Sequence, residues 1–438
     1  MDSTAIILEP SIEDPMSVPA ASQRHTHLKF GAMTSAYCLG VFNDSFFKQA
    51  CMLIAVGLGF AALQGVIMFV FILPYLVAAA PAGWCADRFS KRRVVIATKA
   101  LELLAMLFGA LGIVLVSWPL VLAMAFTMGL QSCLFSPAMN GSVPELYSSA
   151  QVTVANSVLK AAMIAAVLLG TALAGVALES GGALVRPYLG GSLEVASRFV
   201  IAAVVVTVAL LGLVASLATP ARPAAAPTAP FPWAGPAETI RELQSLTRDQ
   251  LLFVAALLGT FVWSIGALQA MLINPLGKVE FGWGDTATSG LLAVEMIGVA
   301  VGGGLAGAFV RGESWKRLLV PCLVAMAGLL GSLAGLWLLP DGVRYSVALA
   351  LLFGSGVVGG LVLIPCEAFV QVRPRAEHRG AVLGAYGFLF GVGVASASLI
   401  AIVLNGLFPP TIGFGITGIF TLGLALLVGR ALRRGAKQ

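Results

Sequence analysis

The stretch FNDSFFKQ, residues 42–49, places an acid and a base one helical turn apart inside a long apolar run. Asp44 and Lys48 are spaced i and i+4, so on a helix they share one face. Asn43 adds a hydrogen-bonding group to the same turn. An ionisable side chain at a bilayer centre costs about 2.5–3.5 kcal/mol on insertion scales, which makes it a functional candidate by default. The pair is either a self-neutralised structural bridge or part of a hydrated wall that contacts a ligand, and we favour the wall.

Other polar side chains also interrupt the apolar runs. Lys99 and Glu102, spaced i and i+3, lie near one end of their run, and this position favours a structural bridge. Glu367 follows Pro365, which removes a backbone hydrogen bond and frees carbonyl groups beside the carboxylate. Glu295 is a further acid inside a run. The predicted substrate-binding residues are Asp44, Asn43, Lys48, Gln131, Asn140, Lys160, Gln269 and Glu367.

Catalytic and metal-binding chemistry finds no support in the residue pattern. The six cysteines form no CxxC pair, and none lies at metal-ligand spacing from a histidine. None of the three histidines begins an H-x-x-x-x-D motif, and no Ser-His-Asp set falls within the apolar runs. We therefore expect no catalytic residue, no metal site, no cofactor and no enzyme activity.

The composition sets the class of protein. Of the 438 residues, 59% are hydrophobic and only 11% are charged, whereas a soluble domain is about 25% charged. A bilayer span needs about 20 mainly apolar residues. Such runs occur at residues 30–57, 64–86, 94–117, 119–141, 152–178, 195–218, 250–276, 287–310, 317–340, 344–370, 380–407 and 411–430. The sequence thus predicts an all-α polytopic membrane protein, with twelve transmembrane helices in two six-helix halves.

A Pro- and Ala-rich break separates the two sets of six runs. The predicted organisation is an N-terminal tail (1–29), a six-helix half (30–218), a linker (219–249), a second six-helix half (250–431) and a C-terminal tail (432–438). Most Lys and Arg residues fall at the termini and in alternate loops, which by the positive-inside rule places both tails and the linker in the cytoplasm. We interpret the net charge of +6 as this topology signal, and we expect no nucleic-acid partner.

The loop after the second run reads GWCADRFSKRRV, residues 83–94. It resembles the G-x-x-x-D-R-x-x-R/K-R/K signature of the major facilitator superfamily, and residues 302–317 look like a degraded copy in the second half. Gly83 would let helices approach closely, and Asp87 would pair with an arginine and cap the neighbouring helix. The charges either only fix the topology or form a latch between the halves in one state of the cycle, and we favour the latch. The predicted gating residues are Gly83, Asp87, Arg88, Lys91 and Arg92.

Five segments together resemble the lysophospholipid transporter branch of that superfamily. They are FNDSFFKQA at 42, GWCADRFSKRR at 83, SPAMNGSVPEL at 136, ANSVLKAAMIAAVLLGTALAGV at 155 and QVRPRAEHRG at 371. The resemblance implies a flippase-like facilitator that moves lysophospholipids, such as lysophosphatidylethanolamine, across the bacterial inner membrane by alternating access. It also implies membrane lipids and a cytosolic acyltransferase as partners, and it matches Asp44 to the acid of the family's first span.

Two positions depart from that branch. Relatives often carry Lys just after SPA, where this chain has Met139, and Arg in the seventh span, where the nearest match is Gln269. Those cations would face a phosphate, so Lys48 or Lys160 would have to substitute for them. The alternative function is a proton-coupled exporter of drugs or small metabolites on the same fold. In that case Asp44 and Glu367 would carry the protons, because desolvation can bring a carboxyl group to titrate near neutral pH.

Overall fold

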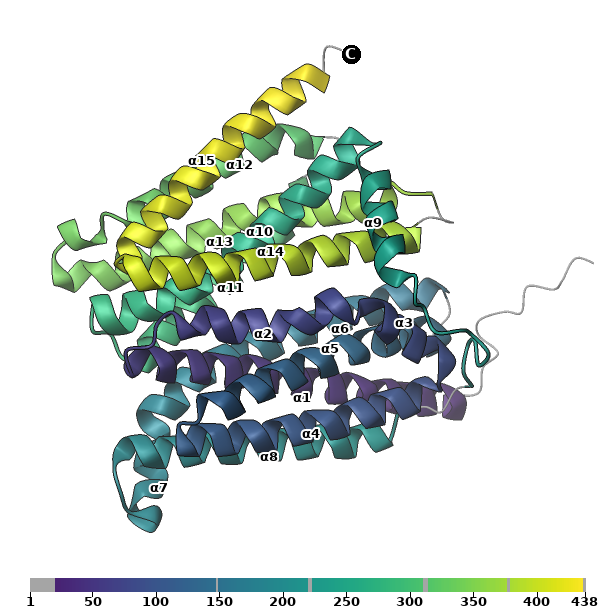
Figure 1. Cartoon of the computed structure of the whole chain (residues 1–438), viewed down its shortest axis with the longest axis horizontal. Helices are drawn as coiled ribbons and strands as arrows, with labels where there is room; N and C mark the ends of the chain where they lie inside the picture. The colour runs from purple at the N-terminus through teal and green to yellow at the C-terminus, as the bar shows by residue number, and fades with distance from the viewer. Residues whose placement is uncertain (1–19, 147–148, 220–222, 310–313, 376–378, 436–438) are drawn as a thin grey trace, which may run out of the picture.

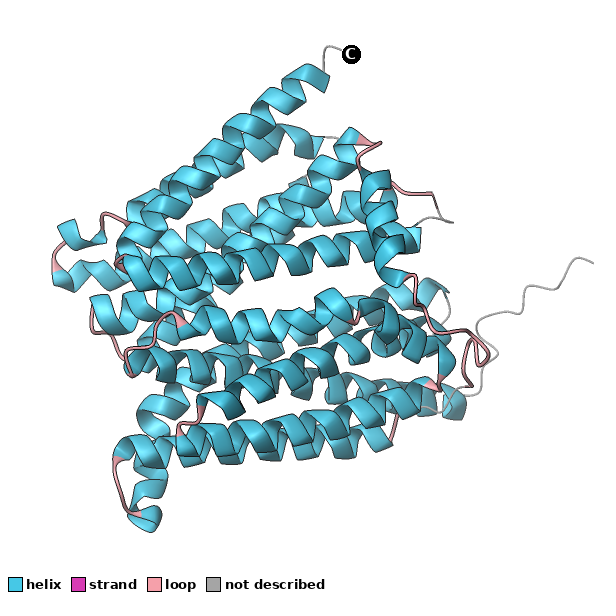
Figure 2. Cartoon of the chain, viewed as in Figure 1, coloured by secondary structure: helices cyan, strands magenta, loops and turns pink. Residues whose placement is uncertain are grey.

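The computed structural model describes residues 20–146, 149–219, 223–309, 314–375 and 379–435. Within these ranges all regular structure is helical, as Figure 2 shows. This confirms the predicted all-α class. A helical fold also suits a protein that spans a bilayer, because a helix forms its backbone hydrogen bonds internally where no water is present.

The first half of the chain forms one helical bundle. Its elements are α1 (Ala20–Gly57), α2 (Leu63–Val77), α3 (Ala79–Arg88), α4 (Lys91–Leu115), α5 (Trp118–Leu146), α6 (Ser149–Val176), η1 (Ala177–Gly181), α7 (Gly182–Leu189) and α8 (Leu193–Leu217). The second half forms the other bundle. Its elements are α10 (Gln250–Pro275), η2 (Leu276–Glu280), α11 (Asp285–Phe309), α12 (Trp315–Leu333), η4 (Leu336–Leu338), α13 (Asp341–Val372), α14 (Arg379–Leu407) and α15 (Pro410–Gly435).

Each predicted apolar run coincides with a helix or a bent pair of helices. In the described part of the chain, ten helices are long and apolar enough to cross a membrane, or eleven if the bent pair α2 and α3 counts as one span. That pair bends by 57°, since Pro81 lacks the N–H that would bond to the Val77 carbonyl. α1 is not among these helices, because the polar residues at 43–49 lower its hydropathy. α1 begins at Ala20 rather than at residue 30.

The two bundles lie side by side with their helices roughly parallel (Figure 1). They meet where α2 packs on α14 and where α6 packs on α11. A short helix, α9 (Gly235–Leu246), falls within the predicted linker and lies across one end of the molecule, on the right in Figure 1. We call this end the linker end, and the opposite end, where α1 is followed by α2, the far end.

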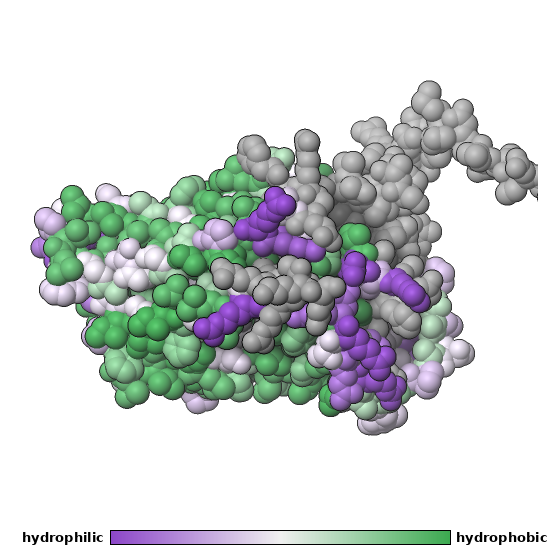
Figure 3. Space-filling view, turned by 90° about the horizontal axis from the view of Figure 1, so that it is seen from above, coloured by the Kyte–Doolittle hydropathy of each residue, from purple (hydrophilic) through white to green (hydrophobic). Residues whose placement is uncertain are grey.

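The outer surface is predominantly apolar. Figure 3 shows hydrophobic residues over most of the upper face, with the hydrophilic ones gathered toward the linker end. Exposed leucine, phenylalanine and valine side chains line the outer helices, as on α4, where Leu104, Leu107 and Leu111 are each more than two-fifths exposed. Such a surface is stable in lipid, because the acyl chains are as apolar as the side chains that they contact.

The closest packing in the second half joins α11 to α13 through glycines. A Cβ added at Gly302 would lie 2.0 Å from the backbone carbonyl oxygen of Val357, and one at Gly356 would lie 2.1 Å from the backbone carbonyl oxygen of Glu295. Gly360 meets the Val299 oxygen at 2.2 Å in the same way. Small residues at such positions let membrane helices approach backbone to backbone. These contacts lie within one half, so they serve packing rather than sliding between the halves.

Replacing Gly302 by alanine should therefore destabilise the fold. The added methyl group overlaps the Val357 carbonyl, and relieving an overpacked contact typically costs about 1–3 kcal/mol. Thermal unfolding of the detergent-purified protein measures the effect. Gly304→Ala is the control, since a Cβ there meets nothing within 4 Å although it lies on the same helix. Equal melting temperatures for the two variants would contradict the packing contact.

Candidate functional site

The acid and base of the first span form an ion pair on α1. Lys48 Nζ lies 3.0 Å from Asp44 Oδ2, and 19% of the surface of each side chain is exposed. Lys48 Nζ also lies 3.9 Å from the centre of the Phe71 ring on α2, a cation–π contact. The second carboxylate oxygen of Asp44 is buried and has no hydrogen-bond partner among the described residues. One Asp44 oxygen therefore has no partner and both side chains are partly exposed, whereas a purely structural ion pair would be fully buried and fully hydrogen-bonded.

A second polar cluster lies in the other half, on α10, α13 and α14. Trp263 donates from its indole nitrogen to Glu367 Oε1 at 2.9 Å, and its ring meets Phe390 edge-on at 5.5 Å. The Tyr386 hydroxyl is buried without a partner in the described chain. It lies so close to Gly259 that a Cβ there would approach it to 2.4 Å. The Glu367 side chain has this one hydrogen bond, from Trp263, and is partly exposed.

An apolar contact between α2 and α14 connects these two clusters. Ile72, Val394 and Ala395 form its buried centre, and Tyr75 and Phe390 pack against them. We call this contact the seam. Tyr75 is adjacent to Phe71, with ring centres 6.2 Å apart, and Phe390 contacts Trp263. Charged groups from each half thus flank an aromatic, apolar boundary between the halves, an arrangement that matches a molecule with one polar head and one tail.

Three predicted binding residues use their polar groups inside a single half. Asn43 is fully buried and donates to the Val205 carbonyl at 3.0 Å. Gln131 donates to Glu102 Oε2 at 3.3 Å. Gln269 accepts from the Ser355 hydroxyl at 3.1 Å and is 3% exposed. The structure does not bring these residues together with Asp44 and Lys48.

The remaining cation candidates are also separate. Lys160 is exposed on α6, and the side chain of Asn140 lies outside the described residues. Met139, at the position where relatives carry lysine, is 1% exposed in an apolar cluster with Met33 and Phe135. A lysine at this position would bury its ammonium group beside these apolar side chains, which is costly for a charge without a partner.

The gating residues hold the linker in this structure. Arg88 and the Trp84 indole both donate to the Ala229 carbonyl, at 3.2 and 3.0 Å. Arg92 donates to the Leu217 carbonyl at the end of α8, at 2.7 Å, where the helix dipole favours a cation. The Asp87 backbone carbonyl accepts from Ala226 N–H at 2.9 Å. Lys91 also has a partner.

Two details of the predicted loop need correction. A Cβ at Gly83 would meet nothing within 4 Å, so Gly83 does not mediate the close helix approach predicted for it. The Asp87 carboxylate is exposed and forms no ion pair in the part of the chain that the structure describes. It also does not cap α4, whose N-cap residue is Ser90. A latch role for these residues in another conformation stays a prediction.

A polar network that the charge pattern did not indicate joins the halves at the far end. Gln49 on α1 donates to Asn274 Oδ1 at 2.9 Å, and Asn274 donates to Gln64 Oε1 on α2 at 2.8 Å. Gln49 also donates to Ser289 at 3.3 Å, and Glu179 accepts from the Thr286 N–H of α11 at 2.8 Å. The sequence did carry a signal for this network, because Gln49, Gln64 and Asn274 are amide side chains inside predicted apolar runs. The network closes the far end.

Two bundles that meet along an aromatic seam, with a closed far end, form the architecture of secondary transporters built from paired repeats. The Major Facilitator Superfamily matches residues 29–398. The lysophospholipid transporter LplT of Serratia proteamaculans is 30% identical over 317 residues, 71% of this chain and 72% of its own length. LplT of Yersinia enterocolitica is 28% identical over 71% of this chain and 70% of its own.

Solved structures show the same fold at low identity. A bacterial homologue of the human lysosomal transporter Spinster, solved inward-facing and unoccupied, has a TM-score of 0.67 at 16% identity and covers 94% of this chain and 98% of its own. The nucleoside transporter NupG has a TM-score of 0.70 at 12% identity, with coverages of 92% and 99%. The chain belongs to the major facilitator superfamily, and within it to the branch of the LplT relatives. It is therefore a multi-pass membrane transporter.

Proposed function

We infer that the chain moves lysophospholipids, such as lysophosphatidylethanolamine, across a bacterial inner membrane by alternating access. The observation that carries this proposal is the partly exposed Asp44–Lys48 pair beside Phe71 and the seam. A zwitterionic headgroup can exchange ion pairs with it, phosphate to Lys48 and ammonium to Asp44. The exchange conserves the number of charge-assisted hydrogen bonds, so binding needs no net loss of pairing. The single acyl chain would lie along the apolar seam.

The proposed topology follows from the position of the basic loops. Arg88 and Arg92 lie at the linker end, and positive loops face the cytoplasm, so both termini and the linker would be cytoplasmic. With the far end closed, the bound headgroup would exchange with the cytoplasmic side in this conformation. A cytosolic acyltransferase that consumes the imported lysolipid is the partner that this direction suggests.

Uptake by reconstituted protein tests the proposal. Proteoliposomes would be given labelled lysophosphatidylethanolamine, lysophosphatidylcholine and lysophosphatidic acid in parallel. We expect saturable, protein-dependent movement of at least the zwitterionic lysolipids, because their headgroups offer both charges. Movement of all three at the rate of protein-free liposomes would eliminate the proposed substrate class.

Replacing Asp44 by asparagine should reduce lysophosphatidylethanolamine transport by about tenfold or more, since a charge-assisted hydrogen bond is worth about 1.5–3 kcal/mol. Lys48→Met should do the same through the phosphate. Asp341→Asn, in an exposed i,i+3 pair with Arg344, is the matched control and should transport normally. Wild-type rates for the Asp44 variant, at equal expression and melting temperature, would remove Asp44 from the substrate path.

One observation favours a second candidate, proton-coupled transport. Glu295 on α11 is 5% exposed, and its carboxyl group forms no ion pair or hydrogen bond in the described chain. A buried carboxyl group without a partner is a candidate proton carrier. Collapse of an imposed proton gradient separates the two functions: lysolipid movement that continues unchanged favours the facilitator, and movement that stops favours proton coupling.

A further inference from the structure

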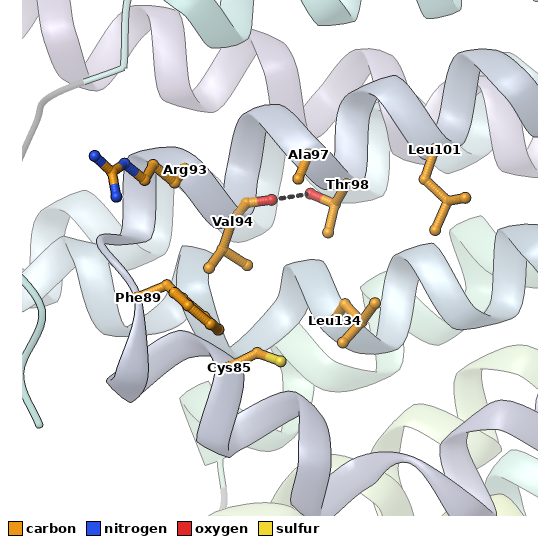
Figure 4. A pocket seen from close by; sticks show the side chains of 8 residues that line it. All are labelled: Cys85, Phe89, Arg93, Val94, Ala97, Thr98, Leu101 and Leu134. Atoms are coloured by element: carbon orange, nitrogen blue, oxygen red, sulfur yellow. Dashed lines mark hydrogen bonds between the residues drawn. The ribbon is translucent and has the colours of Figure 1, made fainter. Parts of the chain in front are cut away.

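An apolar cavity of about 410 Å³ lies on the outer side of the first half, between α3, α4 and α5. Its wall on α4 runs through Arg93, Ala97 and Leu101, which repeat every four residues and so follow one face of the helix. Figure 4 shows Arg93 at one end of this row and Leu101 at the other, with Cys85 and Phe89 of the α3 region and Leu134 of α5 opposite.

The interior of this cavity presents hydrocarbon. The Thr98 hydroxyl donates within its own helix to the Val94 and Val95 carbonyls, both at 2.9 Å, and its residue is only 3% exposed, so it offers the cavity little polar surface. Ala97 is exposed and small, which leaves a trough between the larger Arg93 and Leu101. Because α4 turns apolar side chains to the lipid along the rest of its length, the trough opens to the acyl region of the bilayer.

The charge at the mouth of the trough is unsatisfied by the protein. Arg88 and Arg92 of the same basic loop donate to the carbonyls of Ala229 and Leu217, and Lys91 has a partner. Arg93 is exposed and forms no hydrogen bond or ion pair with any described residue. It lies at the linker end of α4, where a helix that crosses the membrane reaches the headgroup region.

We propose that this trough is a binding site for a bilayer phospholipid with an anionic headgroup, one acyl chain lying along Ala97 and Leu101 and the phosphate on Arg93. The ligand must be amphiphilic, since only such a molecule can place an apolar chain in the trough and a polar group on the Arg93 guanidinium. A guanidinium binds phosphate in a bidentate manner and with charge assistance, which favours a phospholipid over a neutral lipid. Basic side chains at this depth select anionic headgroups.

The site is separate from the Asp44–Lys48 pair. The trough is formed by α3, α4 and α5 on the outer side of the first half, whereas the pair lies on α1 beside Phe71. Lipid bound there contacts Cys85 and Phe89, which flank Arg88 of the loop that holds the linker, so it would stabilise the arrangement of the linker end. The proposal does not depend on the identity of the transported substrate.

Native mass spectrometry of protein released from nanodiscs of equal phosphatidylglycerol and phosphatidylcholine tests the site. The wild type should retain phosphatidylglycerol in preference to phosphatidylcholine. Arg93→Gln should lower the retained phosphatidylglycerol by about fivefold, the effect of one basic side chain at the membrane surface. Arg317→Gln, an exposed arginine at the corresponding end of α12, is the matched control and should retain it fully.

A second pair of variants tests the trough itself. Ala97→Phe fills it and should lower phosphatidylglycerol retention to a similar extent, whereas Ala100→Phe adds the same ring to an exposed position of α4 outside the cavity and should not. Lys48→Met should leave retention unchanged, which keeps this result distinct from loss of the substrate site. Equal effects of Arg93→Gln and Arg317→Gln, or equal retention of both lipids by the wild type, would overturn the proposal.

Discussion

Lys99→Met is expected to lower the free energy of unfolding by about 3–5 kcal/mol, because it strands a charge inside the first half. Lys99 and Glu102 are 1% and 0% exposed, and Lys99 Nζ lies 2.6 Å from Glu102 Oε2. Gln131 adds a hydrogen bond to the same oxygen, and the ammonium group lies 5.2 Å from the centre of the Phe135 ring. A Cβ at Gly40 on α1 would come within 2.4 Å of the ammonium nitrogen. Without Lys99, the carboxylate keeps only the amide.

The double variant Lys99→Met with Glu102→Gln should recover most of the lost stability, since replacing both partners removes the stranded charge and an uncharged amide can bond to Gln131. Thermal unfolding in detergent measures all three proteins, and lysolipid transport is measured on the double variant. A folded, transporting double variant establishes a structural pair. A double variant as unstable as the single would contradict the pairing argument, and a stable one that does not transport would place Lys99 or Glu102 in the mechanism.

The fold was predictable because the bilayer imposes a simple constraint on sequence. Each span needs about 20 apolar residues, and the runs at 94–117 and 195–218, for example, correspond to α4 and α8. Helix ends outside the apolar region follow other rules. α1 extends back to Ala20 because a helix can continue through polar residues once it leaves the hydrocarbon. The bend between α2 and α3 depends on Pro81, which the hydropathy profile does not register.

The site was predictable only in part, because sequence shows which polar residues enter the membrane but not which residues they meet. The i,i+4 spacing correctly implied the Asp44–Lys48 contact, since both lie on one helix. Gln131 and Gln269 looked equivalent to them in sequence, yet their partners, Glu102 and Ser355, lie on other helices. Phe71 and Tyr75 were indistinguishable from ordinary apolar residues until the tertiary packing placed them beside the pair.

Replacing Asn274 by alanine should open the far end. Asn274 is fully buried and bonds to both Gln49 and Gln64, so it is the one described side chain that links the second half to α1 and α2 together. Three lost hydrogen bonds, two with Gln49 and one with Gln64, weaken the closed state by about 1.5–4.5 kcal/mol, which is a shift of at least about tenfold toward states with the far end open. In those states water can satisfy Gln49 and Gln64, so the open state loses little.

Hydrogen–deuterium exchange measures this shift without introducing labels. Exchange should rise at the end of α1 and the start of α11, where Gln49 and Ser289 meet, and fall near the linker end as that end closes in compensation. Asn43→Ala is the matched control, since Asn43 is also a fully buried asparagine but donates to the Val205 carbonyl within the first half. If both asparagine variants raise exchange equally, the network is only local packing. A rise confined to Asn274→Ala at one end, with a fall at the other, identifies the amide cluster as the contact that opposes far-end opening and couples the two ends through rocking of the halves.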